Sequence, residues 1–406
     1  MASKILSWQG RQLKLNTRAD VEPLLAGIDP ATIEEIHLGG NTVGIEAAQA
    51  LADFLAKATS IKVADFADIF TGRLITEIPP ALSAICDALI DKTSLVEINL
   101  SDNAFGGRSV DPMVPFLTQN RSFQILKLNN NGLGPAGGEI IANALLKSAE
   151  LSKAAGTPSN LRVVICGRNR LENGSAPAWA AAFAAHGGLR EVRMPQNGIR
   201  MHGITALAHA LAENPALAHV DLQDNTFTEE GDLSGVAAWA AALKAWPALH
   251  TLNLSDCVLS GEGEVPAVVA ALAEGSNPAL HTLRLQNNNL EAATFERLAD
   301  ALATELAALR RLELQWNEQE EDDEFLARIA ESLRIKGGKL YATDEDEEEE
   351  EGAKEEEAKE DEPAASIPPA PPIVAAEQEK EQKTISDKVT DELADLLSKV
   401  SIKSTT

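Results

Sequence analysis

The sequence predicts a leucine-rich-repeat solenoid of the α/β class, in which parallel strands line the concave face of a horseshoe and helices cover its convex face. The template L-x-x-L-x-L-x-x-N-x-L recurs ten times at intervals of 28 to 38 residues. Leu13 and Leu15 fit a degraded first unit that serves as a cap, so we expect about eleven repeats. The ten units begin at Ile33, Ile61, Leu95, Phe123, Leu161, Leu189, Leu217, Leu249, Leu280 and Leu309.

Each unit has the pattern of a short strand, a turn and then a helix. Residues 95–100 (LVEINL) alternate with a period of two, which predicts a strand with one buried face. Within residues 44–55, Ile45, Ala48, Leu51 and Leu55 recur at helical spacing, which predicts an amphipathic helix. Because no unit can bury its apolar faces alone, neighbouring units must stack and curve.

The template asparagine occurs in eight of the units, and we interpret it as structural. A polar side chain at one repeat phase must find partners if it is buried, so we expect its amide to satisfy backbone groups of adjacent turns. Two units lack it and carry Ile69 or Cys257 instead, and the Ile69 unit is also one of the two longest. The eight are Asn41, Asn103, Asn131, Asn169, Asn197, Asn225, Asn288 and Asn317.

The charge balance narrows the class of partner. The chain has 35 basic and 62 acidic residues, a formal net charge of −27, which argues against nucleic acid and anionic membranes and favours a basic protein. Its three cysteines are widely spaced and predict neither a zinc site nor a disulfide framework, so a reducing compartment is expected. We find no signal peptide and no apolar run of about 18 residues, so we expect no membrane insertion.

Composition divides the chain into three parts. We expect a leucine-rich-repeat domain over residues 1–340, an acidic and Pro-rich disordered linker over 341–380, and a C-terminal tail over 381–406. Residues 344–362 contain 14 acidic residues and two lysines. Apolar residues at helical spacing within 383–403 predict an amphipathic helix that binds a partner or acts as a transport signal, with a marginal helix that frays in solution as the alternative.

Motifs for an intrinsic active site are missing. The sequence has no phosphate-binding loop, no H-E-x-x-H and no G-x-S-x-G, and its seven histidines are not spaced as a metal pair. We therefore expect no metal and no cofactor. The polar residues that follow each strand form a row along the rim that is a candidate binding surface for a partner protein. Each residue taken singly is interpreted as a solvated surface residue. They are Asp68, Asp102, Asn130, Arg168, Gln196, Asp224, Asp256 and Asn287.

Two features depart from the repeat pattern. The first is the segment 68–73 (DIFTGR), which replaces the regular turn in a lengthened unit and presents Arg73 on a non-repeating excursion. The alternative for Arg73 is a surface salt bridge with Asp68 or Glu77. The second is Asn130, an exposed asparagine directly beside the ladder residue Asn131.

At these residues the chain resembles the Ran GTPase-activating proteins of the fungal type. The similarity covers essentially the whole repeat domain and includes motifs that go beyond generic repeat leucines, and an acidic tail is also typical of that family. The matching segments are 68–73 (DIFTGR), 100–106 (LSDNAFG), 130–135 (NNGLGP), 166–175 (CGRNRLENGS) and 222–228 (LQDNTFT).

The resemblance implies an activator that positions the catalytic groups of another protein's active site. Ran hydrolyses GTP slowly because its catalytic glutamine is poorly placed, and the asparagine that matches Asn130 is thought to position that glutamine. The arginine that matches Arg73 is essential in the family but is not thought to act as an arginine finger, so we assign Arg73 to ordering or docking the switch region. Where this chain has Ile75, family members can carry a lysine, whose contact is then absent here.

The remaining expectations follow from the same resemblance. The partner is Ran in its GTP form, with a Ran-binding protein as an optional third component, and GTP and Mg belong to that partner. The chain is expected to be a cytoplasmic monomer, with the nuclear envelope as a second location. The alternative function is a non-catalytic binding or scaffold protein of the ribonuclease-inhibitor kind. Besides Asn130 and Arg73, which act on the GTPase, we expect partner contacts from Asp68, Asp102, Lys127, Arg168, Arg170 and Asp224.

Overall fold

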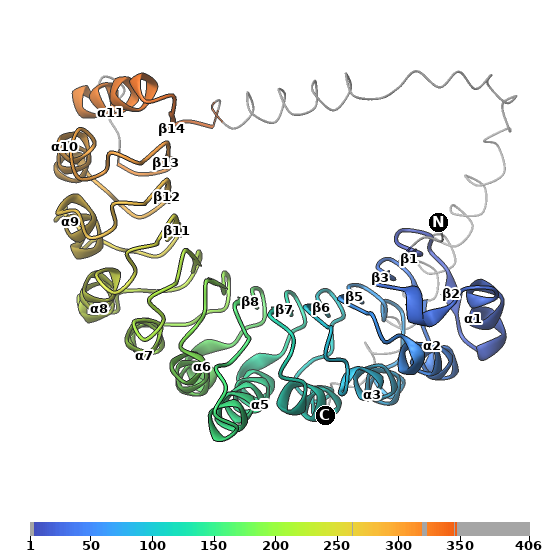
Figure 1. Cartoon of the computed structure of the whole chain (residues 1–406). Helices are drawn as coiled ribbons and strands as arrows, with labels where there is room; N and C mark the ends of the chain where they lie inside the picture. The colour runs from blue at the N-terminus through green and yellow to red at the C-terminus, as the bar shows by residue number, and fades with distance from the viewer. Residues whose placement is uncertain (1–3, 262, 319–322, 345, 347–406) are drawn as a thin grey trace, which may run out of the picture. The chain divides into compact units, whose positions relative to one another are not determined.

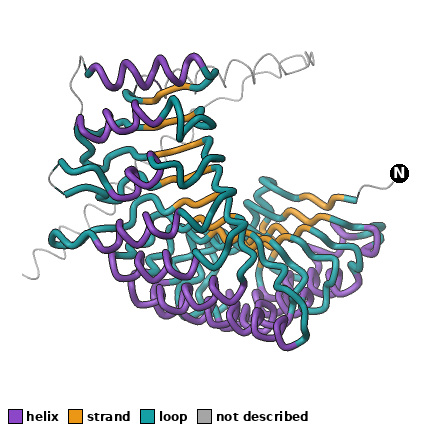
Figure 2. Tube along the Cα trace, turned by 60° about the vertical axis from the view of Figure 1, so that its left-hand side comes forward, coloured by secondary structure: helices purple, strands orange, loops and turns teal. Residues whose placement is uncertain are grey.

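The computed structural model describes residues 4–261, 263–318, 323–344 and 346. These residues form one repeat domain, a curved arc with its strands on the inner side and its helices on the outer side (Figure 1). The turned view in Figure 2 shows the same two layers, strands inside and helices outside. The predicted tail over 381–406, and all of the predicted linker except residues 341–344 and 346, lie outside the described residues.

Twelve short strands build a single parallel sheet, in the order β1-β3-β5-β6-β7-β8-β9-β10-β11-β12-β13-β14. The strands are β1 Ile5–Ser7, β3 Glu35–His37, β5 Val63–Asp65, β6 Glu97–Asn99, β7 Ile125–Lys127, β8 Val163–Ile165, β9 Glu191–Arg193, β10 His219–Asp221, β11 Thr251–Asn253, β12 Thr282–Arg284, β13 Arg311–Glu313 and β14 Lys339–Tyr341. Ten of them, β3 and β5 to β13, begin two residues after the first residue of their template, so the strand positions predicted from the ten templates are confirmed.

The register of this sheet stacks one apolar residue from every repeat. The central residue of each strand faces the helices, and successive central residues pair directly, as Ile36 does with Ala64 and Ile98 with Leu126. The first and third residues of each strand therefore face the concave side. Parallel pairing with no register slip follows from the repeat, because each unit offers the same apolar positions to the next one.

Helices return the chain along the convex side in nearly every unit. They are α1 Arg18–Leu25, α2 Ile45–Lys57, α3 Ile78–Leu89, α4 Val114–Gln119, α5 Gly134–Ala154, α6 Glu172–His186, α7 Met201–Leu211, α8 Ser234–Leu243, α9 Ala267–Ala273, α10 Ala292–Ala301 and α11 Glu324–Ile335, with short 3-10 turns at Pro30–Thr32 and Asp111–Met113. In α2, Ala48, Leu51 and Leu55 are buried, which confirms the helical spacing predicted for that segment.

The two ends of the solenoid differ from the sequence expectation. The first strand is β1, whose Leu6 and the following Trp8 are buried, whereas Leu15 lies in β2 (Lys14–Leu15) and pairs with β4 (Thr42–Val43). At the other end β14 adds a twelfth strand after the last recognisable template. Among the residues that the structure describes, both end units have one face without a neighbouring repeat, so their sequences need not follow the template of the interior units.

The template asparagines form a buried ladder, as predicted, which is interrupted at Ile69 and Cys257. The amide of Asn103 donates to the carbonyl oxygens of Leu100 (3.0 Å) and of Phe66 in the preceding unit (2.9 Å). Its Oδ1 accepts from the backbone N–H of Ile69 at 2.8 Å, so the unit without an asparagine is held by its neighbour. Cys257 donates its N–H to Asn288 in the same way. Asn317 makes these bonds although it is only half-buried.

We expect Asn197→Ala to lower the free energy of unfolding by about 2 to 3 kcal/mol, because it leaves buried backbone groups without partners. The Asn197 amide donates to Cys166 O (2.8 Å) and Met194 O (3.0 Å), and its Oδ1 accepts from Asn169 N–H (2.9 Å). Urea denaturation measures the loss. Gln196→Ala, one residue away on the exposed rim, should stay within about 0.5 kcal/mol of the parent protein, and equal losses in both would contradict the ladder interpretation.

The two longest units place their additional residues differently. In the unit that carries Ile69, the added residues form the turns between Thr71 and Glu77, ahead of α3. In the unit that begins at Phe123, they extend α5 to 21 residues. Only the first addition creates an irregular loop, and that loop carries Arg73.

Candidate functional site

One residue in each interior unit makes the exit turn from the strand in the left-handed backbone region. Asp68, Asp102, Asn130 and Arg168 occupy this position in four consecutive units, with φ between 47° and 60°. Their N–H groups bond across the units, for example Asp102 N to Asn129 O at 2.8 Å and Asn130 N to Gly167 O at 2.9 Å. The four residues therefore form a contiguous row on the rim, as the sequence predicts.

Asn130 and Asp102 are hydrogen-bonded on this row. Asn130 Nδ2 donates to Asp102 Oδ1 at 3.0 Å, and both side chains are exposed. The carboxylate can only accept, so the amide must present its NH2 group to Asp102 and keep its oxygen away. Within the described part of the chain, Asn130 Oδ1 has no hydrogen bond, which leaves an acceptor for a partner molecule.

The same pair recurs further along the rim. Asn287 Nδ2 donates to Asp256 Oδ1 at 2.6 Å, and Asn287 has the same left-handed backbone with φ of 49°. Asparagine tolerates this region better than most residues, so the backbone alone accounts for an asparagine at position 130. Asn287 is therefore a matched control for any special property of Asn130.

Arg73 lies on the irregular loop, but its side chain folds back onto the N-terminal cap and is only 10% exposed. Its Nε donates to Thr42 Oγ1 at 2.8 Å, and its Nη2 donates to Thr42 O at 3.0 Å and Leu15 O at 3.1 Å. Of the two ion pairs considered, the one with Glu77 is present at 3.7 Å. Asp68 instead accepts a hydrogen bond from Thr71.

Arg73 thereby fixes a loop that exposes apolar side chains. Leu74 is 68% exposed and Ile75 is 56% exposed, which is unusual for large hydrophobic residues in this domain. Glu77 closes the loop from the other side, because its Oε2 accepts the Leu74 N–H at 2.9 Å. Ile75 therefore presents an apolar side chain on the exposed side of this loop.

The other predicted contact residues are spread along the concave face and the rim. Lys127 ends β7 on the concave side and pairs with Glu97 at 2.5 Å. Arg168 and Arg170 are exposed and have left-handed backbones, and among the described residues neither side chain has an ion pair. Asp224 occupies the same rim position two units beyond Arg168. Asp224 is therefore separated from the Asp68–Arg168 row by Gln196.

Two features of this rim were missed in the sequence. The first is the Asn130–Asp102 pair, which joins residues 28 positions apart. The second is the pair of apolar side chains beside Arg73. A signal for the backbone geometry was available, since Gly, Asp or Asn precedes most ladder positions and these residues favour positive φ.

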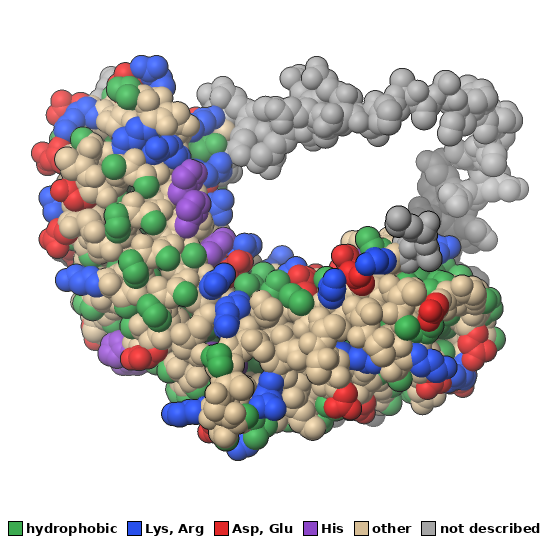
Figure 3. Space-filling view, viewed as in Figure 1, with side chains coloured by type: hydrophobic (Ala, Val, Ile, Leu, Met, Phe, Trp, Pro, Cys, Tyr) green, Lys and Arg blue, Asp and Glu red, His purple; other side chains and the backbone are tan. Residues whose placement is uncertain are grey.

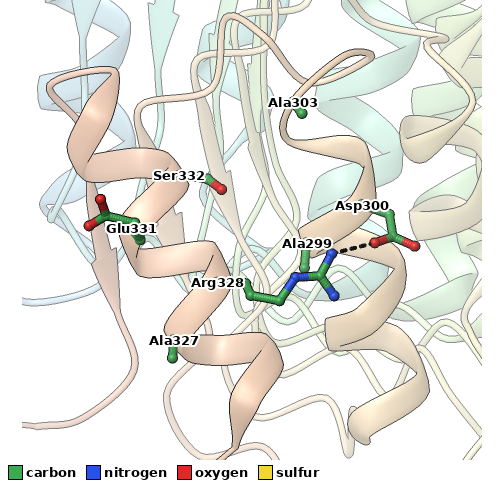
Figure 4. A pocket seen from close by; sticks show the side chains of 7 residues that line it. All are labelled: Ala299, Asp300, Ala303, Ala327, Arg328, Glu331 and Ser332. Carbon is green, nitrogen blue, oxygen red and sulfur yellow. Dashed lines mark hydrogen bonds and ion pairs between the residues drawn. The ribbon is translucent and has the colours of Figure 1, made fainter.

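Two pockets in the described residues lie away from this rim. One of about 690 Å³ lies between α10 and α11, where Arg328 pairs with Asp300 at 2.6 Å (Figure 4). Another of about 570 Å³ is lined by residues that include Lys92, Asn120 and Arg121. Within the described residues no group of three or more His, Cys, Asp and Glu side chains could hold a metal ion. No helix among them is long and apolar enough to cross a membrane.

Comparison with known proteins identifies several relatives of this chain. The family model described as "Leucine Rich repeat" matches residues 119–142, which include Asn130. The chain is 36% identical over 332 residues to Ran GTPase-activating protein 1 of Saccharomyces cerevisiae, covering 80% of each chain. It is 47% identical over 198 residues to Ran GTPase-activating protein 1 of Xenopus laevis, covering 48% of this chain and 34% of that protein. An internalin structure from Listeria monocytogenes is 17% identical with a TM-score of 0.41, covering 77% of this chain and 81% of that one.

The stacked parallel strands, the convex helices and the asparagine ladder define a leucine-rich-repeat protein with a polar rim. Within that class, the chain belongs to the Ran GTPase-activating protein family, as the relationship to the yeast protein over four-fifths of both chains shows.

Proposed function

We propose that this chain accelerates GTP hydrolysis by the small GTPase Ran and supplies no active site of its own. Membership of the family carries the proposal, and the exposed Asn130–Asp102 pair gives it a physical basis. GTP and Mg are held by the partner, which is engaged in its GTP form. The chain acts as a cytoplasmic monomer that supports nucleocytoplasmic transport, with the nuclear envelope as a second site and a Ran-binding protein as an optional third component.

Asn130 would act by positioning the glutamine of the GTPase. Phosphoryl transfer depends mainly on positioning and electrostatics, and a misplaced water-orienting glutamine slows it. Asp102 holds the NH2 group of Asn130 at 3.0 Å, so the amide oxygen is oriented before the partner arrives. That oxygen can accept from the NH2 group of a glutamine side chain and restrict its rotation. Asp102 is then a positioning residue that acts through Asn130.

Arg73 would act by ordering the surface on which the switch region docks, and not as an arginine finger. Its three hydrogen bonds to Thr42 and Leu15 keep the 71–77 loop against the cap. Leu74 and Ile75 then offer a fixed apolar contact to the partner. The exposed Arg168 and Arg170 supply positive charge on the same rim, and Lys127, Asp68 and Asp224 extend the contact on the concave face and rim.

A hydrolysis assay tests the proposed function. Sub-stoichiometric amounts of this chain, added to GTP-loaded Ran with Mg, should raise the hydrolysis rate by about three to five orders of magnitude, as activators of related GTPases do. Turnover by catalytic amounts separates activation from simple binding. No acceleration at micromolar protein would contradict the proposal, and tight binding without turnover would favour the scaffold alternative.

A further inference from the structure

The two halves of the concave face differ in charge at equivalent positions. We compare the residue before each strand with the first and third residues of that strand. Across β1 to β8 these positions hold four basic and four acidic residues, whereas across β9 to β14 they hold six basic and three acidic residues. The second set is Arg190, Arg193, Arg284, Arg310, Arg311 and Lys339 against Glu191, Asp221 and Glu313. We call this surface the C-terminal concave face.

In the N-terminal half the charges neutralise one another. Glu34 pairs with Lys4 at 2.5 Å and with Lys62 at 2.6 Å, and Glu97 pairs with Lys127. Arg162 donates only to the backbone oxygens of Ser159 and Leu161. The numbers of basic and acidic residues are nevertheless equal in this half, so this part of the concave face has no net positive charge for a ligand.

The C-terminal concave face lacks this balance. Glu191 is taken by Arg193 at 2.6 Å, and Glu313 is shared between Arg284 at 2.9 Å and Arg311. Arg310 donates to the backbone oxygens of Ala307 and Leu309, which carry no net charge. In the described residues Arg190 has neither an ion pair nor a side-chain hydrogen bond. A local positive excess thus lies on a chain whose total charge is −27.

Histidines line the same surface, and the positive charge there contributes to a lowered pKa of His219. His250 and His281, which precede β11 and β12, stack with ring centroids 4.8 Å apart. Backbone bonds place them in one row, since His281 N–H donates to His250 O and Arg310 N–H donates to His281 O. Burial, and then the charges of Arg193 and Arg284, lower the pKa of His219 to about 4. Figure 3 shows Lys, Arg and His side chains gathered on the inner side of the arm that carries β11 to β14.

The structure also shows that a carboxylate of this chain is accommodated at the end of that surface. Lys339, the first residue of β14, pairs with Asp346 at 3.7 Å. Asp346 also accepts the N–H groups of Ala342 and Thr343 at 3.0 Å each, so acidic chain can be held there by both charge and backbone.

We propose that the C-terminal concave face binds an acidic segment of a partner protein. Six neighbouring strands span roughly 24 Å, which an extended peptide of about seven residues can cross. Arginine forks recognise carboxylates well, and a short peptide remains within the positive patch. A nucleic acid longer than such a peptide would extend beyond the positive patch, and its phosphates would be repelled by the acidic surface of the rest of the protein. A protein partner is therefore favoured over nucleic acid. The proposal does not depend on the proposed function, whose two acting residues, Arg73 and Asn130, follow β5 and β7. Of the contacts proposed there, only Asp224 follows a strand of the C-terminal concave face, β10.

A peptide-binding experiment on the full chain tests this. A fluorescently labelled peptide of about eight Asp and Glu residues, long enough to cross the strands, should bind at low ionic strength, and its Asn/Gln counterpart should not. The double variant Arg190→Glu/Arg310→Glu should weaken binding by about tenfold or more, because two charge pairs are replaced by repulsions. Arg297→Glu, an exposed residue of α10 on the convex side, should leave binding within about twofold, with half the change in total charge made by the double variant.

A second measurement needs no variant. Bound carboxylates should raise the pKa of His219 and of His281, because they favour the imidazolium form, and imidazole resonances followed by NMR report this shift. Absence of peptide binding, or binding that Arg190→Glu/Arg310→Glu and Arg297→Glu weaken equally, would overturn the proposal. An RNA oligonucleotide of equal charge that bound more tightly through the same arginines would overturn the class of partner.

Discussion

Replacing Asn130 by alanine should lower the single-turnover rate of stimulated GTP hydrolysis by about two to three orders of magnitude, the usual effect of removing one preorganised hydrogen bond from a transition state. Affinity for the GTP-bound partner should change by only about threefold, because one rim contact among many is lost. Single-turnover hydrolysis with saturating activator separates the two quantities.

The chain provides controls for the backbone effect of this substitution. Asn130 has φ of 52°, so alanine adds strain of about 1 kcal/mol that is unrelated to the amide. Asn130→Gly removes the amide without that strain and should lose as much activity as Asn130→Ala. Asn287→Ala, at the equivalent position with the equivalent Asp256 partner, should keep nearly full activity. Comparable losses at both asparagines would mean that position 130 has only a structural role.

Asp102 should affect hydrolysis indirectly, because it holds the side-chain amide of Asn130. Asp102→Ala should lower the hydrolysis rate by about tenfold, because it releases the Asn130 amide without removing it and costs about one hydrogen bond. Asp256→Ala is the matched control and should have no comparable effect. A rate unchanged by Asp102→Ala would show that Asn130 does not need its anchor.

Replacing Arg73 by alanine should lower stimulated hydrolysis by at least about 100-fold and destabilise the N-terminal cap by at least about 4 kcal/mol. Three hydrogen bonds from one guanidinium to Thr42 and Leu15 are lost, and bonds to a charged donor are worth about 1.5 to 3 kcal/mol each. The 71–77 loop then loses its attachment, and Leu74 and Ile75 no longer offer an ordered contact. Hydrolysis assays and urea denaturation measure the two effects.

Conservative variants decide how Arg73 acts. Arg73→Lys keeps the charge but cannot reproduce the fork, so it should recover only part of the activity. Thr42→Val removes the Oγ1 atom that accepts the hydrogen bond of Arg73 Nε at 2.8 Å, and it leaves the exposed side of the loop unchanged. This variant should lower stimulated hydrolysis severalfold. If Thr42→Val left activity intact while Arg73→Ala abolished it, Arg73 would act directly on the partner and not through the loop.

The repeat architecture could be predicted because its information is local and repeated. A single apolar period defines the strand, and an asparagine in eight of the ten units identifies the ladder, so Asn131 could be placed inward and Asn130 outward without coordinates. The end units could not be placed in this way. Leu6 in β1 and Leu340 in β14 belong to units that have only one neighbour, and their sequences carry no complete template.

The rim positions of the candidate site residues were predictable, but their contacts were not. The rim position of Asn130 follows from the repeat phase, whereas its bond to Asp102 joins neighbouring units. Arg73 was expected on an excursion, yet its side chain lies against Leu15, which is 58 positions earlier in the chain. Such contacts depend on how much one unit rotates against the next, which no single segment encodes.

By itself the sequence determined a leucine-rich-repeat solenoid with an inward asparagine ladder and an outward polar rim, because side-chain periodicity alone decides which residues are buried. The tertiary structure decided which of the outward residues meet. Stacking brings Asp102 within 3.0 Å of Asn130, folds Arg73 onto the cap and gathers arginines from separate repeats into one basic face. The physical reason is that burial is a property of each unit, whereas polar contacts and surface charge arise only between units.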